Sequence, residues 1–464
     1  MQPAAKKAKK VNLKVNFAGG EMSEKEEKER YANRKNCGRR ACEGLNVHLE
    51  KRALWEDLGT RSGSSRFEFE RVAEVEAYRY MFAPPSARCS ALGARLEEEE
   101  GMIACEGLTG KLNKESLIMD TGEARVRLDM SGVGAWSCFP GQVVRARGSM
   151  EEGVLRVEEM VAPTARAPRS NASEARRYAS MQNHKPLAVW CAAGPYTTND
   201  NLDFLPLNDL LEAVSTQAPD VLVLCGPFVD EKHPLPLKIG DDFVDPFTLF
   251  AVKVAWRLAD SPPTKIVLVP SPTDAIAHSV FPQPPLSDRK DPKFATWDQD
   301  LRVGTLDLPA HVACVSNPAV FRINEIVVGV ATDVLFDLAS EEKSKGMGDA
   351  PRVPRLAGHL LAQRSFYPLV PAVSMPLDLG RLDSLRMPPL DVLLVPSKLA
   401  VFATPVDHVV VVNPGPLAKG AYGGAFAQLT IHPLTTLSSS PSEEEEEAVL
   451  HKVPERTRVD IVRI

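Results

Sequence analysis

The chain has 464 residues, 44% of them hydrophobic, and a formal net charge of −6. This length is enough for two or three domains with substantial cores. The negative charge excludes a globally basic nucleic-acid binder, so contact with DNA is expected to be weak, local or made through a partner. The longest apolar runs fall far short of the ~18 residues that a spanning helix needs, and no membrane association is predicted.

Residues 1–40 are dense in charge and almost free of aromatic side chains. Such a segment buries too little apolar surface to offset its chain entropy, so a disordered tail is predicted. Within the tail, Lys6, Lys7, Lys9 and Lys10 form a basic stretch that resembles a nuclear import signal, with a solvated basic tail as the alternative. Residues 41–99 are predicted to be an irregular segment that leads into the first folded domain.

Residues 100–165 contain short β-like segments separated by turns. These segments lie at residues 117–119, 124–128, 143–147 and 154–161, with glycine-bearing turns between them. This spacing predicts a small closed barrel of the oligonucleotide-binding (OB) type, the five-stranded barrel that fits the length. Trp136 and Phe139 are the only aromatic residues between positions 105 and 162. Because single-strand binders stack bases on several aromatic side chains, protein contact is favoured over DNA contact for this barrel.

Residues 166–186, rich in Ala, Ser and Arg, are predicted to be a linker. Residues 187–464 are predicted to form one α/β domain in which continuous apolar runs alternate with helical patterns. Strands are predicted to begin at positions 187, 221, 266, 312, 326, 392 and 409, and helices to span residues 207–217, 246–259, 332–340 and 354–363. Strands that are apolar on both sides predict a sheet covered by helices on each face.

Two further strands, over residues 426–431 and 458–464, are predicted to flank a Ser- and Glu-rich insertion. The acidic run at residues 443–447 is expected to be a solvated loop. Phosphorylation at Ser442 is the alternative interpretation of this insertion.

The loops after the carboxyl ends of the strands are where an α/β sheet binds its ligands. A two-metal phosphoesterase needs a bridging carboxylate and further Asp, Asn and His ligands in these loops. The strand order and loop placement resemble the calcineurin-like phosphoesterase pattern, but the loops hold mostly Gly and Pro. The residues at these positions are Gly194, Pro195, Gly226, Pro227, Asp230, Ser271, Asp274, Asn413 and Pro414.

These substitutions predict an inactivated phosphoesterase domain with no catalytic residue, no metal and no cofactor. Pro227 stands where the pattern has its bridging Asp, and no His-x-His occurs among the nine histidines. Asp230 and Asp274 are expected to serve loop structure. The alternative is a divergent metal-dependent phosphodiesterase whose site is built from Asp230, Asp274 and His278. The eight cysteines lack Cys-x-x-Cys spacing, and the sequence has no phosphate loop, Gly-x-Ser-x-Gly elbow or His-Glu-x-x-His motif.

Several motifs, in order along the chain, resemble the B subunits of the DNA polymerase alpha/primase complex. They include Phe139-Pro140-Gly141-Gln142-Val143-Val144, Gly194-Pro195-Tyr196-Thr197-Thr198, Gly226-Pro227-Phe228-Val229-Asp230, Gln363-Arg364-Ser365-Phe366-Tyr367-Pro368-Leu369 and Val412-Asn413-Pro414-Gly415. The resemblance runs from about residue 31 to the C-terminus. The ordered series is far more specific than any single motif.

The resemblance implies an OB-type barrel packed against an inactivated phosphoesterase domain. It also implies a non-catalytic, nuclear scaffold for primer synthesis in the initiation of DNA replication. Such a scaffold docks the zinc-bearing C-terminal region of the polymerase alpha catalytic subunit and reaches the primase subunits through the complex. Family members usually carry a small helical domain before the linker, and this sequence is expected to begin within that linker. Accessory subunits of other replicative polymerases share the architecture and are the alternative.

Overall fold

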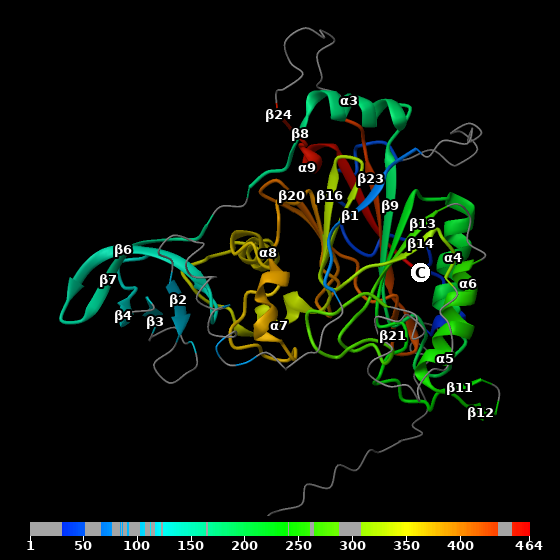
Figure 1. The fold of residues 1–464 in the computed structure, drawn as a ribbon, viewed down its shortest axis with the longest axis horizontal. Helices are drawn as coiled ribbons and strands as arrows, with labels where there is room; N and C mark the ends of the chain where they lie inside the picture. Colours follow the sequence, from blue (N-terminus) through cyan, green and yellow to red (C-terminus); the bar gives the residue numbers. More distant parts are fainter. Residues whose placement is uncertain are drawn as a thin grey trace, which may run out of the picture.

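The computed structural model describes residues 30–51, 66–76, 103–106, 117–121, 124–163, 166–239, 241–259, 264–286, 308–434 and 448–464, with a few single positions between them. Its main body contains two six-stranded sheets (Figure 1). The first sheet has, in spatial order, β14 (Val312–Cys314), β13 (Lys265–Val269), β10 (Val221–Cys225), β9 (Leu187–Ala193), β23 (Ala425–Ile431) and β25 (Thr457–Arg463). The second has β1 (Phe69–Ala73), β15 (Ala319–Ile323), β16 (Ile326–Val330), β18 (Val392–Leu394), β20 (Val409–Asn413) and β19 (Phe402–Val406).

Pairing within the sheets is mixed. Strands β14, β13, β10 and β9 are parallel to one another, as are β16, β18 and β20. The other neighbours, including β9 with β23 and β23 with β25, are antiparallel. The predicted strands are confirmed, but β1, β15 and β19 were not predicted.

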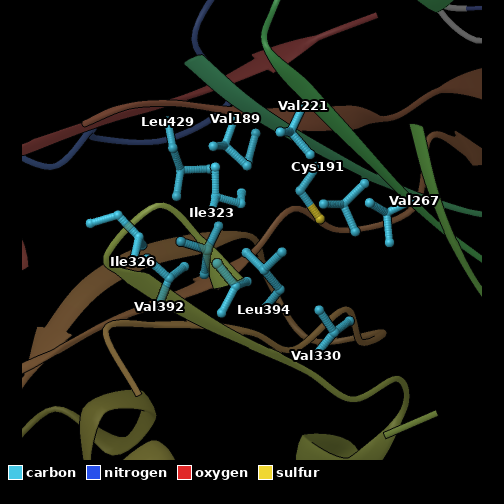
Figure 2. Close-up of a cluster of buried hydrophobic side chains, with 14 of the residues drawn as sticks. Val189, Cys191, Val221, Val267, Ile323, Ile326, Val330, Val392, Leu394 and Leu429 are labelled. Atoms are coloured by element: carbon cyan, nitrogen blue, oxygen red, sulfur yellow. The ribbon is translucent and has the colours of Figure 1, made fainter. Parts of the chain in front are cut away.

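The two sheets pack face to face, and the side chains between them form the main core (Figure 2). Along β9, Val189 and Cys191 lie in this core, whereas Trp190 and Ala192 lie in a second cluster on the opposite face. Full burial of one Val, Leu or Ile side chain contributes about 1.5–3 kcal/mol to folding, so this interface is a large part of the stability.

Helices cover the outer face of each sheet. Helix α4 (Leu205–Gln217), α5 (Pro246–Phe250), a π-helical turn (Ala251–Ala255) and α6 (Trp256–Ala259) pack on the first sheet. Helices α7 (Val334–Glu341) and α8 (Arg352–Ala362) pack on the second. The predicted helices are therefore confirmed. Of the helices that the structure describes, none is long and apolar enough to cross a lipid bilayer.

The predicted single sheet with helices on both faces is wrong. Each sheet has one face against helices and the other face against the second sheet. A strand that is buried on both faces has the same continuous apolar run in either arrangement, because its side chains alternate between two apolar environments. The sequence pattern therefore could not distinguish a second sheet from a second layer of helices.

A closed five-stranded barrel stands beside the main body, as predicted. Its order is β2 (Ile103–Glu106), β3 (Leu117–Asp120), β4 (Arg125–Asp129), β7 (Val154–Val161) and β6 (Val143–Glu151), and β6 pairs back with β2. The pair β4 and β7 is parallel, and the other pairs are antiparallel. Its core includes Leu117, Leu128 and Trp136, the last only 3% exposed.

Backbone and side-chain contacts fasten the barrel to the main body. Strand β5 (Trp136–Cys138) leaves the barrel and pairs antiparallel with β17 (Lys343–Lys345), which follows α7. Phe139 is fully buried among residues of α7 and α8. Gln363, at the end of α8, donates from Nε2 to the carbonyl of Val143 and accepts from its N–H, both at 2.7 Å. The barrel is thus a docked part of one body.

Three predicted segment assignments need correction, and two of them lie in the first hundred residues. The disordered tail was predicted to reach residue 40, but Tyr31 is buried and residues 39–45 pair with the outer edge of β25. Residues 1–29 lie outside the described part of the chain. Within the segment 41–99, which was predicted to be irregular, β1 forms the edge of the second sheet. These pieces acquire their structure by backbone pairing with a distant sheet edge, which local sequence does not reveal.

The predicted linker, residues 166–186, instead contains β8 (Arg169–Asn171) and α3 (Ala172–Met181). The buried face of α3 carries Ala172, Ala175, Tyr178 and Ala179. Because three of these four side chains are alanine, the apolar stripe is too weak to stand out in the sequence. Strand β8 pairs with β24 (Ala448–Leu450), which precedes the short helix α9 (Val453–Arg456). Two small hairpins, β11 (Lys238–Ile239) with β12 (Asp242–Phe243) and β21 (Ala418–Lys419) with β22 (Tyr422–Gly423), are also present.

The contacts of Gln363 predict a measurable cost for its removal. In Gln363→Ala, the buried N–H and C=O of Val143 lose their partner, and we expect a loss of about 2–4 kcal/mol in the free energy of unfolding. Denaturant unfolding measures this change. Gln217→Ala, at an exposed position of α4, is the matched control. A loss in Gln363→Ala no larger than that of the control would contradict the proposed fastening.

Candidate functional site

The loops that follow the parallel strands of the first sheet meet at one edge, as predicted. The N–H of Gly194, after β9, donates to Cys225 O at 2.8 Å, and the N–H of Gly226, after β10, donates to Val269 O at 2.8 Å. Leu417, in the loop after β20, donates to Ala193 O at 2.7 Å. The predicted loop residues therefore lie together where a ligand of such a sheet would bind.

Glycine at two of these positions permits direct loop-to-loop contact. A Cβ on Gly194 would lie 1.9 Å from the carbonyl oxygen of Pro227, and a Cβ on Gly226 would lie 2.7 Å from Asp274 Oδ2. Any other residue would push neighbouring backbone apart. The loops after β9, β10 and β13 are thus packed against one another.

Tyr196 and Phe228 fill the space beneath these loops. Their rings are stacked, with centroids 5.4 Å apart and an interplanar angle of 6°, and both side chains are almost completely buried. The Tyr196 hydroxyl lies 2.9 Å from Cys225 O and 3.1 Å from Ala192 O and donates to these carbonyls. Burial raises the pKa of this phenol well above its ordinary value. The sequence motifs contained both residues, but their packing role was not predicted.

Asp274 is held by the backbone of the neighbouring loop. Its carboxyl accepts from the N–H of Phe228 at 2.8 Å, of Val229 at 3.2 Å and of Ile276 at 3.4 Å. The residue is only 3% exposed, and burial raises its pKa to about 7, against the effect of the three N–H donors, which favour the charged form. A carboxyl with these partners has few lone pairs left for a metal ion, consistent with the predicted structural role.

The remaining polar residues of the loops also have local partners. Asp230 pairs by backbone with Asp274, and its carboxyl accepts from the N–H of Lys232 at 2.9 Å. Ser271 Oγ donates to Asp333 Oδ2 at 3.3 Å, a contact that was not predicted. The side-chain amide of Asn413 donates to Leu399 O at 3.2 Å, and its oxygen accepts from two backbone N–H groups at 3.0 Å.

The third residue of the alternative phosphodiesterase site, His278, is exposed on the surface. Among the described residues, no group of three or more His, Cys, Asp or Glu side chains is arranged to hold a metal ion. Cys37, Cys42, Cys191, Cys225 and Cys314 are in no disulfide. The arrangement therefore brings Asp230 and Asp274 together without completing a metal site within the described part. The basic stretch Lys6, Lys7, Lys9 and Lys10 lies outside the described residues.

Comparison with known proteins identifies the family. Residues 189–404 match the family model for the B subunits of DNA polymerases alpha and epsilon, and residues 98–163 match that for the OB domain of the DNA polymerase alpha B subunit. The chain is 31% identical over 385 residues to the DNA polymerase alpha B subunit of Schizosaccharomyces pombe, and 33% identical over 389 residues to that of Mus musculus. The chain belongs to the family of DNA polymerase alpha B subunits.

The alignments include a larger share of this chain than of the two B subunits. The alignments include 78% and 81% of this chain but 63% and 58% of the S. pombe and mouse proteins. The chain thus spans about 60% of the length of the B subunits that it matches. The matched ranges contain both the barrel and most of the two-sheet body, including the loops after β9, β10 and β13.

The raised pKa of Asp274 predicts how stability changes with pH. The ordinary value is 3.8 and the folded value is about 7. Between these two values the folded chain keeps the proton of Asp274, whereas the unfolded chain releases it. The free energy of unfolding is therefore highest below pH ~4 and falls as the pH rises to about 7. Between these pH values, the free energy of unfolding of the wild-type chain should fall by up to about 4 kcal/mol relative to that of Asp274→Asn. Thermal or denaturant unfolding of both proteins at several pH values measures this, and a constant difference would contradict it.

Proposed function

We propose that this chain is a non-catalytic accessory subunit of the DNA polymerase alpha/primase complex, acting as a scaffold in primer synthesis. The names of its relatives and the match of its barrel to the polymerase alpha OB-domain model support this proposal. The observation that carries it is the packing of the loops at the sheet edge. There, Gly194 and Gly226 bring loops into contact, and Tyr196 and Phe228 fill the space below.

The main body fits an inactivated calcineurin-like phosphoesterase domain. Two central sheets with helices on both outer faces, and loops gathered at the carboxyl ends of parallel strands, agree with that pattern. Pro227 replaces the bridging carboxylate, and Asp274 is engaged by three backbone N–H groups. Hydrolysis by paired metal ions needs ligands that the described loops do not bring together. In this proposal, the main body serves as a docking surface for a partner subunit.

The partner that we propose is the C-terminal region of the polymerase alpha catalytic subunit, with the primase subunits joined through the complex. Contact with DNA is weak or indirect. Trp136 and Phe139, the two aromatic residues of the barrel region, are 3% and 0% exposed. Neither is available as a platform for stacking bases, which supports a barrel that serves protein contact.

A role in another replicative polymerase is the alternative. The family model that matches the main body covers the B subunits of both polymerase alpha and polymerase epsilon, so this part alone does not discriminate. The family model that matches the barrel is specific to polymerase alpha. The barrel therefore favours the alpha complex.

The proposed location is the nucleus, where replication takes place. Lys6, Lys7, Lys9 and Lys10 form the proposed import signal. Deletion of residues 1–10 from a fluorescent fusion tests the signal, and unchanged nuclear accumulation would count against it.

Co-purification tests the proposed complex. Tagged full-length chain isolated from its own cells should bring the large polymerase alpha subunit and both primase subunits, identified by mass spectrometry, in near-equal amounts. Recovery of the polymerase epsilon catalytic subunit in their place would favour the alternative. Recovery of neither would overturn the assignment.

Loss of the metal site predicts no manganese-dependent hydrolysis. Purified chain with excess Mn²⁺ should not hydrolyse bis-(p-nitrophenyl) phosphate above the rate with EDTA, and Asp230→Ala should behave like the wild type. Hydrolysis that requires Mn²⁺ and disappears in Asp230→Ala would establish the divergent phosphodiesterase instead. Two Mn²⁺ ions bound at the loops after β9, β10 and β13 in crystals would do the same.

A further inference from the structure

Away from these loops, three residues distant in the sequence form a continuous hydrogen-bonded chain. Ser170 Oγ lies 2.8 Å from His451 Nε2, and His451 Nδ1 lies 2.8 Å from Asp391 Oδ2. The serine is in β8, the histidine follows β24, and the aspartate precedes β18. Figure 1 shows β8, β24, α9 and α3 together at one end of the molecule.

The order of contacts is that of a nucleophile, a general base and an orienting carboxylate. The serine meets one imidazole nitrogen and the carboxylate meets the other, so a carboxylate on Nδ1 selects the tautomer whose Nε2 accepts the serine proton. His451 and Asp391 are buried, with side chains 3% and 1% exposed, whereas Ser170 is partly exposed. The buried pair is therefore largely shielded from water.

Backbone contacts hold both buried residues in place. Asp391 Oδ2 also accepts from the N–H of Val327 at 2.8 Å, and the N–H of Asp391 donates to Val327 O at 2.9 Å. Arg456 Nε donates to His451 O at 2.8 Å, and its Nη2 forms an ion pair of 3.0 Å with Glu325. A base and an orienting group fixed in this way need little rearrangement before proton transfer.

Hydrogen-bond donors follow the serine directly. Ser170 is two residues before the first residue of α3, a helix of ten residues. The first N–H groups of a helix have no partner within it and carry partial positive charge. The cap residue of this described helix, Asn171, makes no side-chain hydrogen bond to them. The N–H groups at the start of α3 therefore lie within a few residues of Ser170 along the chain.

We propose that Ser170 is an activated nucleophile that accepts acyl groups from small activated carboxylic esters, with His451 as general base and Asp391 as the residue that orients it. The Ser170 Oγ forms a bond to the carbonyl carbon while its proton moves to His451 Nε2. The bond from that carbon to the leaving oxygen then breaks, and His451 returns the proton to the leaving alcohol. The products are acyl-Ser170 and one alcohol. This activity is independent of the proposed scaffold function and of the loops after β9, β10 and β13.

Covalent labelling of the purified full-length chain tests the proposal. A fluorophosphonate probe should label Ser170, with loss of fluoride, and p-nitrophenyl acetate should acylate the same side chain and release p-nitrophenol. Peptide mass spectrometry locates the label. Ser170→Ala should abolish the labelling, and Asp391→Asn and His451→Gln should slow it by about 100-fold.

The matched control is Ser173→Ala, three residues away on the exposed first turn of α3. It should label at the wild-type rate, and thermal unfolding of each variant separates loss of reactivity from loss of folding. Since Ser170→Ala removes only a hydroxyl, a folded variant is expected. Labelling of Ser170 no faster than of Ser173 in folded wild-type chain would overturn the proposal and leave the hydrogen-bonded chain a purely structural contact.

Discussion

Face-to-face packing of two apolar sheets is the constraint on which the rest of this structure depends. The core between the sheets fixes the strands, and the alternation of side chains along each strand then gives each sheet a second apolar face. Helices α4 to α6 cover one of these faces, and α7 and α8 cover the other. The same packing sets where the parallel strands end, and so brings the loops after β9, β10 and β13 to one edge.

At that edge, the loops after β9, β10 and β13 pack closely against one another. Gly194 and Gly226 permit backbone contact, and the stacked rings of Tyr196 and Phe228 fill the volume below. Asp274 has become a hydrogen-bond acceptor for the neighbouring loop. These contacts stabilise a closely packed surface, which agrees with the proposed scaffold function.

The barrel is fastened by the same kind of specific contact. Gln363 binds both backbone groups of Val143, Phe139 is inserted among the helices of the second sheet, and β5 pairs with β17. Barrel and body are therefore held together as one unit. The chain of Ser170, His451 and Asp391 lies in a different region, where β8 and β24 meet the end of the body. The packed loops at the sheet edge and the hydrogen-bonded chain of Ser170 are thus separate features of one molecule.

The sequence by itself determined the barrel, most strands and helices of the main body, and the residue types that stand in the loops. Strand positions followed from continuous apolar runs, and the prediction of a loop without a side-chain metal ligand followed from residue types such as Pro227. Family membership followed from the order of the motifs. The strand and turn patterns are local, so a single stretch of chain carries each of them, whereas family membership needs the whole ordered series of motifs.

Only the tertiary structure decided the second sheet, the pairing of residues 39–45 with β25, the helix α3 and the meeting of Ser170 with His451 and Asp391. A strand buried on both faces has the same pattern against a sheet or a helix, and an alanine stripe carries little signal. The three residues of the hydrogen-bonded chain are separated by 221 and 60 positions, since they stand at 170, 391 and 451. Contacts of this range depend on how distant segments fold onto one another, because no local propensity records which partner a side chain will meet.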